Sequence, residues 1–319
     1  MSSLPFEILQ ADLVRCEEVL FDSLKIGDEF VETISQHLLK SGGKRLRPGL
    51  CILSARSGKN FNLERILPIA AALELIHTAS LVHDDVIDES PLRRGRKTTN
   101  SLWGNQAAIL SGDFLFARAF KLIASHDYGT RISESLAELV ENLSVGEILQ
   151  DRYSFQVVKE FEYLRRIEMK TAGFLSTACE LGAIVGGLTD SDVKKLSNYG
   201  KFIGMAFQLT DDILDIVGNE KNLGKKAGTD LKQGIITLPV IYAVEKSEKL
   251  REIVTNPNIN DAEIEEAIDL ILVSDGIDRS KKLSDEFLDR AKKNLPNDLP
   301  PEILETFIDA ANFIGKRNF

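Results

Sequence analysis

The chain has 319 residues, of which 43% are hydrophobic, and its formal net charge is −10 at pH 7. This acidity argues against a protein that binds nucleic acid or an anionic membrane through bulk charge. The three cysteines, Cys16, Cys51 and Cys179, are far apart and include no Cys-x-x-Cys pair, which argues against a disulfide framework or a zinc site and fits a reducing compartment.

The N-terminal segment MSSLPFEILQADLVRCEEVL carries acids early and has no continuous apolar run. We therefore expect no signal peptide. We also find no apolar stretch of about 20 residues that would predict a transmembrane helix. These features predict a soluble, cytoplasmic protein without stable membrane insertion.

Helical patterns cover most of the chain, and strand alternation bounded by hairpin turns is nearly absent. ERILPIAAALELIHTASLVHDDVIDES predicts a long helix that ends at Ser90 and Pro91, and SNYGKFIGMAFQLTDDILDIVGN predicts another that ends at Gly218. No low-complexity linker divides the chain, so the sequence predicts one all-α domain over residues 1–319. Further helices are expected over residues 7–40, 105–125, 130–150, 160–186, 235–250 and 260–295.

Two segments rich in glycine and charge predict mobile loops. They are SPLRRGRKTTNSLWGN, which begins at Ser90, and GNEKNLGKKAGTDLKQG, which begins at Gly218. Each follows one of the two long helices, so each is expected to lie next to the last turn of its helix.

The first long helix ends in an acidic cluster in which Asp84, Asp85 and Asp88 stand at i, i+1 and i+4. Residues four apart lie on one face of a helix, about one turn or roughly 6 Å apart. Like charges at this spacing repel each other and destabilise a helix. Hard cations such as Mg²⁺ prefer carboxylate oxygens and share their remaining ligands with substrate phosphates, so the cluster is a candidate magnesium site.

The same Asp-Asp-x-x-Asp pattern recurs in LTDDILD, on the second long helix, with Asp211, Asp212 and Asp215. Two such clusters facing each other would hold several Mg²⁺ ions around one diphosphate. A solvated acidic face is the alternative. Both clusters are embedded in apolar residues, however, and burying unpaired acids is costly, which favours the metal interpretation.

A di-iron bundle is a different metal hypothesis, and it would need glutamates together with a Glu-x-x-His pattern. None of the four histidines is so placed; they are His37, His77, His83 and His126. Aspartate oxygens favour Mg²⁺ instead.

Several basic segments supply cations for anionic ligands. SGGKRLRPGL places Lys44, Arg45 and Arg47 after two glycines, and arginine grips phosphate oxygens in a fork. An exposed basic turn is the alternative here. Further along, cations follow each acidic cluster or stand between the two; they are Arg93, Arg94, Lys170 and Lys225. Lys170 has the alternative role of a surface lysine whose stem covers apolar surface.

Taken in order, seven segments resemble the trans-isoprenyl diphosphate synthases, or polyprenyl synthetase family, and most closely its long-chain members. They are GGKRLRP, LIHTASLVHDDVIDESPLRRG, GEILQ, KTAGFL, FQLTDDILD, LGKKAGTD and TLP, and they extend over nearly the whole chain. The resemblance implies a helical fold around a deep central cavity, usually in a homodimer. It also implies a prenyltransferase that adds isopentenyl diphosphate head to tail to an allylic diphosphate such as farnesyl diphosphate.

The resemblance implies Mg²⁺ as the cofactor, with about three ions per active site when substrate is bound. The metal ligands it implies are Asp84, Asp88 and Asp211, with Asp85, Asp212 and Asp215 in support. The residues implied for isopentenyl diphosphate are Lys44, Arg47, His77 and Arg94. Those implied for the allylic diphosphate are Arg93, Lys170, Thr171, Gln208 and Lys225. His83 is expected to be structural, and Ile235 stands where family members often carry a lysine.

In this family, bulk just before the first acidic cluster limits product length. Here the positions five and four residues before it are Ala79 and Ser80, both small, and Ile76 lies further up the helix. We expect the tail to grow along this helix, giving an all-trans product of about C30 to C45 as a quinone side-chain precursor. A ring at Ala79 would fill that space, so Ala79→Phe is expected to shorten the product to about C15 or C20.

Other functions stay open on the sequence alone. The chain could be the catalytic subunit of a two-component synthase that needs a small partner, or a shorter-chain synthase that makes a C20 product. A terpene cyclase would usually retain one acidic cluster of this kind. A non-catalytic regulator would be expected to have lost acids or basic anchors, and a metal-binding scaffold would bind Mg²⁺ without diphosphate.

Overall fold

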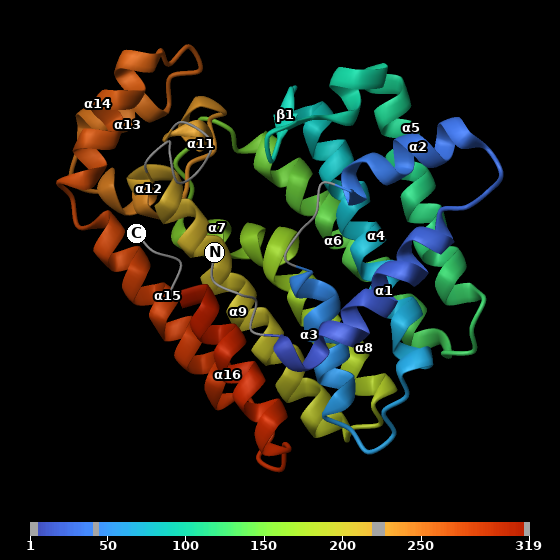
Figure 1. Cartoon of the computed structure of the whole chain (residues 1–319). Helices are drawn as coiled ribbons and strands as arrows, with labels where there is room; N and C mark the ends of the chain where they lie inside the picture. The colour runs from blue at the N-terminus through green and yellow to red at the C-terminus, as the bar shows by residue number, and fades with distance from the viewer. Residues whose placement is uncertain (1–5, 41–44, 219–226, 316–319) are drawn as a thin grey trace. The chain divides into compact units, whose positions relative to one another are not determined.

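The structure is a computed structural model that describes residues 6–40, 45–218 and 227–315 (Figure 1). Its regular secondary structure in the described ranges is helical except for one hairpin, formed by β1 (Leu92–Arg93) and β2 (Arg96–Lys97). The predicted all-α fold class is confirmed.

The chain forms two compact units, each assembled from three segments. Unit 1 comprises Met1–Val140, Leu175–Ser197 and Leu295–Phe307, and unit 2 comprises Glu141–Phe174, Asn198–Asn294 and Ile308–Phe319. The single domain expected over residues 1–319 stays a prediction, and each unit is described by itself.

Unit 1 is built around α4 (Leu63–Ile87), which packs against α1, α2, α3 and α5. Asn62 caps this helix by accepting a hydrogen bond from the backbone N–H of Arg65. Residues Ile66 to Ile76 are buried on every face, as expected for a helix whose sequence is apolar all round. The other early elements are η1 (Glu7–Leu9), α1 (Gln10–Ser23), α2 (Glu29–Leu39), α3 (Leu46–Arg56) and α5 (Thr99–Ala124).

The helix α4 is long and apolar enough to cross a membrane by length and composition, which was not expected from the sequence. In the structure, 78% of its apolar window is buried inside the protein. Its hydrophobicity is therefore accounted for by core packing. The three cysteines are free and buried.

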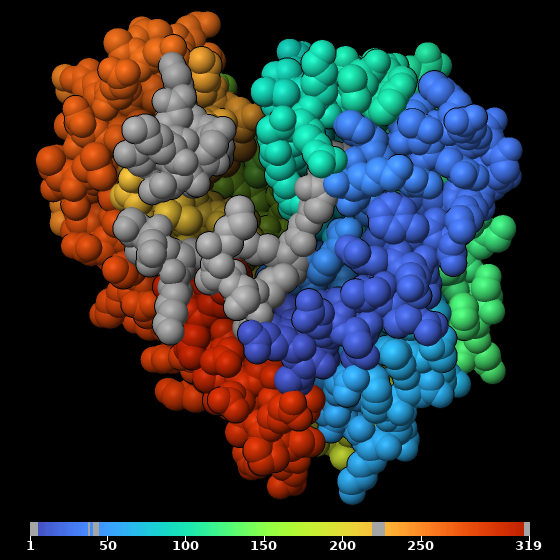
Figure 2. Space-filling view, viewed as in Figure 1, coloured from blue at the N-terminus to red at the C-terminus, as the bar shows by residue number. Residues whose placement is uncertain are grey.

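Hydrogen bonds hold the hairpin of unit 1 against its neighbours. Figure 2 shows the hairpin and the start of α5, in teal, next to α2, in blue, on the surface of this unit. The mobile loop predicted from Ser90 onwards is therefore a folded hairpin followed by the first turn of α5. Long-range contacts fix a segment whose glycine and charge content alone indicated mobility.

The later helices are α6 (Thr130–Arg152), α7 (Glu160–Ile167), the π-helical turn η2 (Glu168–Ala172), α8 (Gly173–Val185) and α9 (Asp190–Val217), followed by α11 (Thr229–Lys232), α12 (Leu238–Ala243), α13 (Glu248–Val254), α14 (Asp261–Leu272), α15 (Gly276–Lys293) and α16 (Pro301–Gly315). Within unit 2, α12 packs against α7, α14 and α15.

Three of the expected helices are divided by non-helical residues, and the one predicted over 235–250 becomes α12 and α13. The one predicted over 7–40 breaks at Gly27, whose φ of 85° lies in the left-handed region that favours glycine. The one predicted over 260–295 breaks between Leu272 and Gly276. A Cβ at Gly276 would collide with the carbonyl oxygen of Pro239, so glycine lets α15 begin against α12.

The helices α3 and α8 approach each other closely in unit 1 at Gly182. A Cβ there would lie well inside contact distance of the carbonyl oxygen of Cys51 on α3. Replacing a glycine by alanine on an exposed helix stabilises a protein by about 0.4–1 kcal/mol. Here overpacking should outweigh that gain.

We predict that Gly182→Ala lowers the free energy of unfolding by roughly 1–3 kcal/mol, because the two backbones must move apart to admit the methyl group. Urea denaturation followed by circular dichroism measures this change. An unchanged or raised stability would show that α3 and α8 are not in such close contact.

Candidate active site

The first acidic cluster occupies the end of α4 in unit 1. Asp84 is half-buried, Asp85 has no exposed surface and Asp88 is exposed. Asp88 is the C-cap, and its N–H donates to the carbonyl oxygen of Asp84. The C-terminal end of a helix carries partial negative charge, so three carboxylates there are unfavourable without nearby cations.

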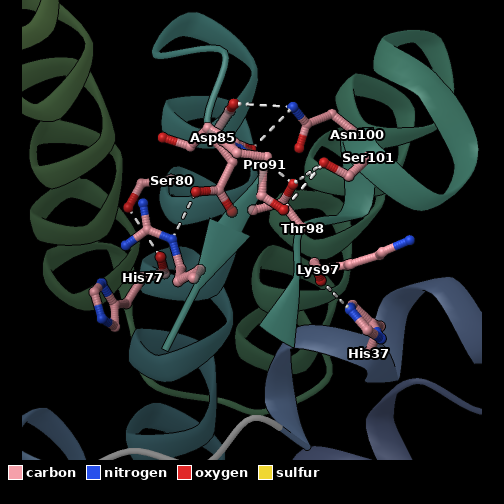
Figure 3. A network of polar contacts seen from close by, with 11 residues as sticks. His37, His77, Ser80, Asp85, Pro91, Lys97, Thr98, Asn100 and Ser101 are labelled. Carbon is pink, nitrogen blue, oxygen red and sulfur yellow. Dashed lines mark hydrogen bonds and ion pairs between the residues drawn. The ribbon is translucent and has the colours of Figure 1, made fainter. Parts of the chain in front are cut away.

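Arg93 supplies one such cation to the buried acid of this cluster. Its Nε donates to Oδ1 of Asp85 over 2.7 Å (Figure 3). Burial raises the pKa of Asp85, and the arginine opposes this rise. The other carboxylate oxygen, Oδ2, is buried and finds no hydrogen-bond partner among the described residues, which leaves an oxygen suited to a cation or to water.

The base of the hairpin is fastened to the end of α4 and to the start of α5. The side-chain amide of Asn100 donates to the carbonyl oxygens of Asp85 and Ser90. Thr98 donates to Ser90 through its hydroxyl and to Pro91 through its N–H. Figure 3 shows these residues gathered around Asp85. The hairpin therefore presents Arg93 and Arg94 from a defined position next to the acids.

A positively charged group surrounds His77, one turn of α4 before Ser80. Burial lowers the pKa of the His77 imidazole well below its usual value. Four arginines lie near enough to lower this pKa further, and they are Arg47, Arg94, Arg93 and Arg45. The structure thus brings together the described residues predicted for isopentenyl diphosphate, namely Arg47, His77 and Arg94. Clustered cations around a neutral imidazole form a site that an anion would stabilise.

Arg45 has a supporting role in this group. Its φ of 44° is in the left-handed region, directly before α3. The guanidinium is largely buried and donates to Glu17 over 3.0 Å and to Glu74 over 2.6 Å. These ion pairs hold a strained backbone at the start of the helix that carries Arg47. Lys44, predicted for the same ligand, lies outside the described residues.

The second acidic cluster lies on α9 in unit 2, and its three acids differ in environment. Asp211 is half-buried, whereas Asp212 and Asp215 are each 2% exposed. Oδ2 of Asp215 accepts a hydrogen bond from the N–H of Asp230 in the first turn of α11. Asp215 thereby fastens the later part of the second predicted loop, of which residues 219–226 lie outside the described residues.

Asp212 points into the interior of unit 2, where neutral donors surround it. The hydroxyl of Tyr163 donates to its Oδ2, and the amide of Gln208 donates to its Oδ1 over 2.7 Å. Burial raises the pKa of Asp212 to about 7, although both hydrogen bonds favour the charged form. The resemblance implied a supporting role for this acid beside the metal ligands, and in the structure it is a buried hydrogen-bond acceptor.

The chain of hydrogen bonds continues from Gln208 to the π-helical turn. The hydroxyl of Thr171 donates to Oε1 of Gln208 over 2.8 Å. Lys170, the neighbouring residue of η2, forms an ion pair with Glu147 of α6. Of the residues predicted for the allylic diphosphate, unit 2 thus brings Thr171 and Gln208 into contact, and Lys170 directly precedes Thr171 in the chain. A π-helical turn is a frequent feature of functional sites.

Two residues of this network, Tyr163 and Glu147, were not predicted from the sequence. Tyr163 is fully buried, and nothing in the local pattern of α7 distinguishes it from a core aromatic residue. Glu147 lies in GEILQ, a segment that supported the family resemblance without a role for its acid. Lys225, the remaining predicted ligand of the allylic diphosphate, lies outside the described residues.

The three positions predicted to control product length lie along α4. Ala79 and Ile76 have no exposed surface, and Ser80 is half-buried with its hydroxyl donating to the carbonyl oxygen of His77. Ser80 and Asp84 are one turn apart on the same face. His83 packs against α5, where a Cβ at Gly112 would collide with its ring, in accordance with the structural role expected for it.

Within the described ranges, no three acidic, histidine or cysteine side chains are arranged to hold a metal ion by themselves. The acids nevertheless suit Mg²⁺, because this ion commonly takes one or two carboxylates and completes its shell with water and substrate phosphates. Asp84 and Asp88, at i and i+4, offer hard oxygen donors of this kind. A dedicated protein cage is therefore not required.

The polyprenyl synthetase family model matches residues 28–271. The chain belongs to the polyprenyl synthetase family. A heptaprenyl diphosphate synthase component 2 from Geobacillus stearothermophilus is 42% identical over 317 residues, which cover 98% of each chain. A nonaprenyl diphosphate synthase from Mycobacterium tuberculosis is 36% identical over 292 residues, covering 90% of this chain and 87% of the relative.

Solved structures agree with this family membership. The polyprenyl synthase from Caulobacter crescentus CB15, complexed with calcium and isoprenyl diphosphate, matches with a TM-score of 0.92 and 33% identity, and the match covers 100% of both chains. The resemblance found in the motifs is confirmed, and so is the prediction of an enzyme of the prenyltransferase class.

Asp212 gives the metal-free polyprenyl synthetase a distinctive pH dependence. Its pKa is near 3.8 when unperturbed and about 7 in the folded protein. Between these values the folded state binds more protons than the unfolded state, so the free energy of unfolding falls as pH rises from about 4 to 7 and is level above that.

We predict that this acid contributes a decline of roughly 2–4 kcal/mol over that window. Asp212→Asn should remove this part of the pH dependence of the free energy of unfolding. The substitution also removes one hydrogen bond, which lowers the stability of the variant by the same amount at every pH. Urea titrations of both proteins at several pH values, with a metal chelator present, measure the difference. Parallel stability curves for the two proteins would contradict the prediction.

Proposed function

We propose that this polyprenyl synthetase is a Mg²⁺-dependent enzyme that condenses isopentenyl diphosphate onto an allylic diphosphate to make a long-chain, all-trans polyprenyl diphosphate. The observation that carries the proposal is the pairing, within unit 1, of the acids of α4 with the cationic group around His77. A diphosphate would neutralise the cationic group around His77, and a divalent cation would neutralise the acids of α4. The names of the relatives, heptaprenyl and nonaprenyl diphosphate synthase, support the long-chain assignment.

In this proposal the chain's own residues bind and orient two diphosphates. Isopentenyl diphosphate is held by Lys44, Arg47, His77 and Arg94, where fork-like guanidinium contacts suit phosphate oxygens. The allylic diphosphate is held by Arg93, Lys170, Thr171, Gln208 and Lys225. Lys170 already pairs with Glu147, so the diphosphate competes with that carboxylate for the ammonium group.

Mg²⁺ fits the acids of both clusters, which would hold about three ions, and when bound these ions neutralise charge on the leaving diphosphate. Asp84, Asp88 and Asp211 are the proposed ligands. Asp85 and Asp215 are proposed to support them, Asp85 by holding Arg93 and Asp215 by holding the start of α11. The calcium and isoprenyl diphosphate in the complex of the Caulobacter relative support this assignment.

The proposed reaction begins when the bond between the allylic carbon and the diphosphate oxygen breaks, with the electron pair leaving on the diphosphate. The double bond of isopentenyl diphosphate then supplies the pair for the new carbon–carbon bond. Loss of a proton restores a double bond, and the released diphosphate accepts that proton. The preorganised cations stabilise the charge that develops on the leaving group, and electrostatic stabilisation of this kind usually contributes most to the rate enhancement of an enzyme.

Quaternary structure and location are further parts of the proposal. Large apolar side chains are exposed on one face of α5, at Ile109, Leu110 and Phe120, and an apolar helix face of this kind suits a subunit interface. We propose a homodimer. The relatives named as component 2 favour the alternative of a small partner subunit. We also propose a cytoplasmic enzyme that releases its product to a membrane.

We predict that the purified chain, given Mg²⁺, farnesyl diphosphate and labelled isopentenyl diphosphate, forms a ladder of products that ends at one length of about C30 to C45. Chromatography of the dephosphorylated products measures this, and light scattering of the same sample gives the oligomeric state. No incorporation despite Mg²⁺-dependent diphosphate binding would favour the two-component alternative. Neither incorporation nor binding would refute the proposal.

We predict that Ser80→Phe shortens the product to about C15 or C20, because the ring would block the growing tail on the face of α4 that bears Asp84. Ala79→Phe is expected to do the same, but Ala79 has no exposed surface, so its melting temperature must be compared with that of the native chain. Ser80→Ala is the matched control and should keep the native length. A folded, active Ser80→Phe enzyme with unchanged product length would refute this placement of the tail.

A further inference from the structure

The hairpin of unit 1 is too short to hold its own position. Its strands have two residues each and pair only through Leu92 with Lys97 and Arg93 with Arg96. An isolated two-stranded hairpin is marginally stable at best in water. Under the proposed function this hairpin carries Arg93 and Arg94 to the two diphosphates, so whatever fixes it also fixes those cations.

The first strand is fixed by Asp85, which holds Arg93. The second strand is fixed by the last turn of α2, where Nε2 of His37 lies 2.7 Å from the carbonyl oxygen of Lys97 (Figure 3). A carbonyl oxygen only accepts, so Nε2 carries the proton and donates. A second bond connects the same elements, since Arg96 donates to the carbonyl oxygen of Lys40 over 3.0 Å.

The ring of His37 is itself held in place by Trp103. The two rings meet edge to face, with centroids 5.2 Å apart and planes at 83°. Trp103 precedes Gly104, whose φ of 84° interrupts the helical backbone of α5. That interruption separates the first turn of α5, which also bears Asn100, from the rest of the helix. The imidazole is thus oriented by one neighbour and donates to another.

We propose that His37 is a positioning residue: it fixes the hairpin to α2 and so places Arg93 and Arg94 for diphosphate binding. The inference rests on the proposed function for the identity of the ligand. The hydrogen bond of His37 goes to the backbone of Lys97, so its effect on Arg93 and Arg94 passes through the hairpin.

Three variants separate the hydrogen bond from ring packing. His37→Phe keeps an aromatic ring beside Trp103 and removes the donor. His37→Gln keeps a donor at the same reach and removes the ring. His126→Phe is the matched control, because His126 also bonds to a backbone carbonyl and packs against an aromatic ring, at the other end of α5.

Binding of inorganic diphosphate in the presence of Mg²⁺, measured by calorimetry on the full chain, is the primary test. We expect His37→Phe to weaken binding roughly threefold to tenfold, the usual worth of one hydrogen bond. His37→Gln should bind within about twofold of the native chain, and His126→Phe should not differ from it. Melting temperatures should be similar in all four proteins. Trp103 is the single tryptophan, so its fluorescence reports whether the ring pair is intact.

Native affinity in His37→Phe would overturn the proposal, as would equal weakening in His37→Phe and His126→Phe. Weakening in His37→Gln as large as in His37→Phe would also overturn it, since packing rather than donation would then matter. If the native chain binds no diphosphate, the proposed function fails. Amide hydrogen exchange then tests separately whether His37 fixes the hairpin to α2. Faster exchange at residues 92–97 in His37→Phe then supports the positioning role, and unchanged exchange refutes it.

Discussion

Repulsion between carboxylates at the end of α4 is the constraint on which the candidate site in unit 1 depends. Three acids stand in its last turn or directly after it, at the end of the helix that already carries partial negative charge. One of them, Asp85, is completely buried. Arg93 offsets that burial with a direct hydrogen bond. The chain must therefore return to α4 immediately after leaving it, and the hairpin is the short structure that does so.

The two acidic clusters share the same spacing, but their buried middle acids are stabilised in different ways. In unit 1 the middle acid, Asp85, is neutralised by an arginine. In unit 2 the corresponding Asp212 is surrounded by the neutral donors Tyr163 and Gln208, and its pKa rises to about 7. The arrangement in unit 1 keeps the carboxylate of Asp85 charged and orients the guanidinium of Arg93. The second connects α9 to the π-helical turn through Gln208 and Thr171, so it orients neutral groups instead.

In each unit, carboxylates of the chain itself hold the cations in place. Arg93 is paired with Asp85, Arg45 with Glu17 and Glu74, and Lys170 with Glu147. Side chains that are already ordered lose less conformational entropy when a ligand binds. An incoming diphosphate must, in exchange, compete with the resident carboxylates, and this competition is weakest where a divalent cation binds those carboxylates at the same time.

The sequence by itself determined the helical fold, the two acidic clusters, the basic segments near them and the family, because these follow from residue types at fixed local spacing. Only the tertiary structure decided that Asp85 pairs with Arg93, that Tyr163 bonds to Asp212 and that the segment after Ser90 is a clamped hairpin. It also divided the helices expected over 7–40, 235–250 and 260–295. Burial and pairing arise between residues far apart in the chain, such as His37 and Lys97. Periodicity along the sequence reports only local spacing, so it does not predict which distant residue will be the partner.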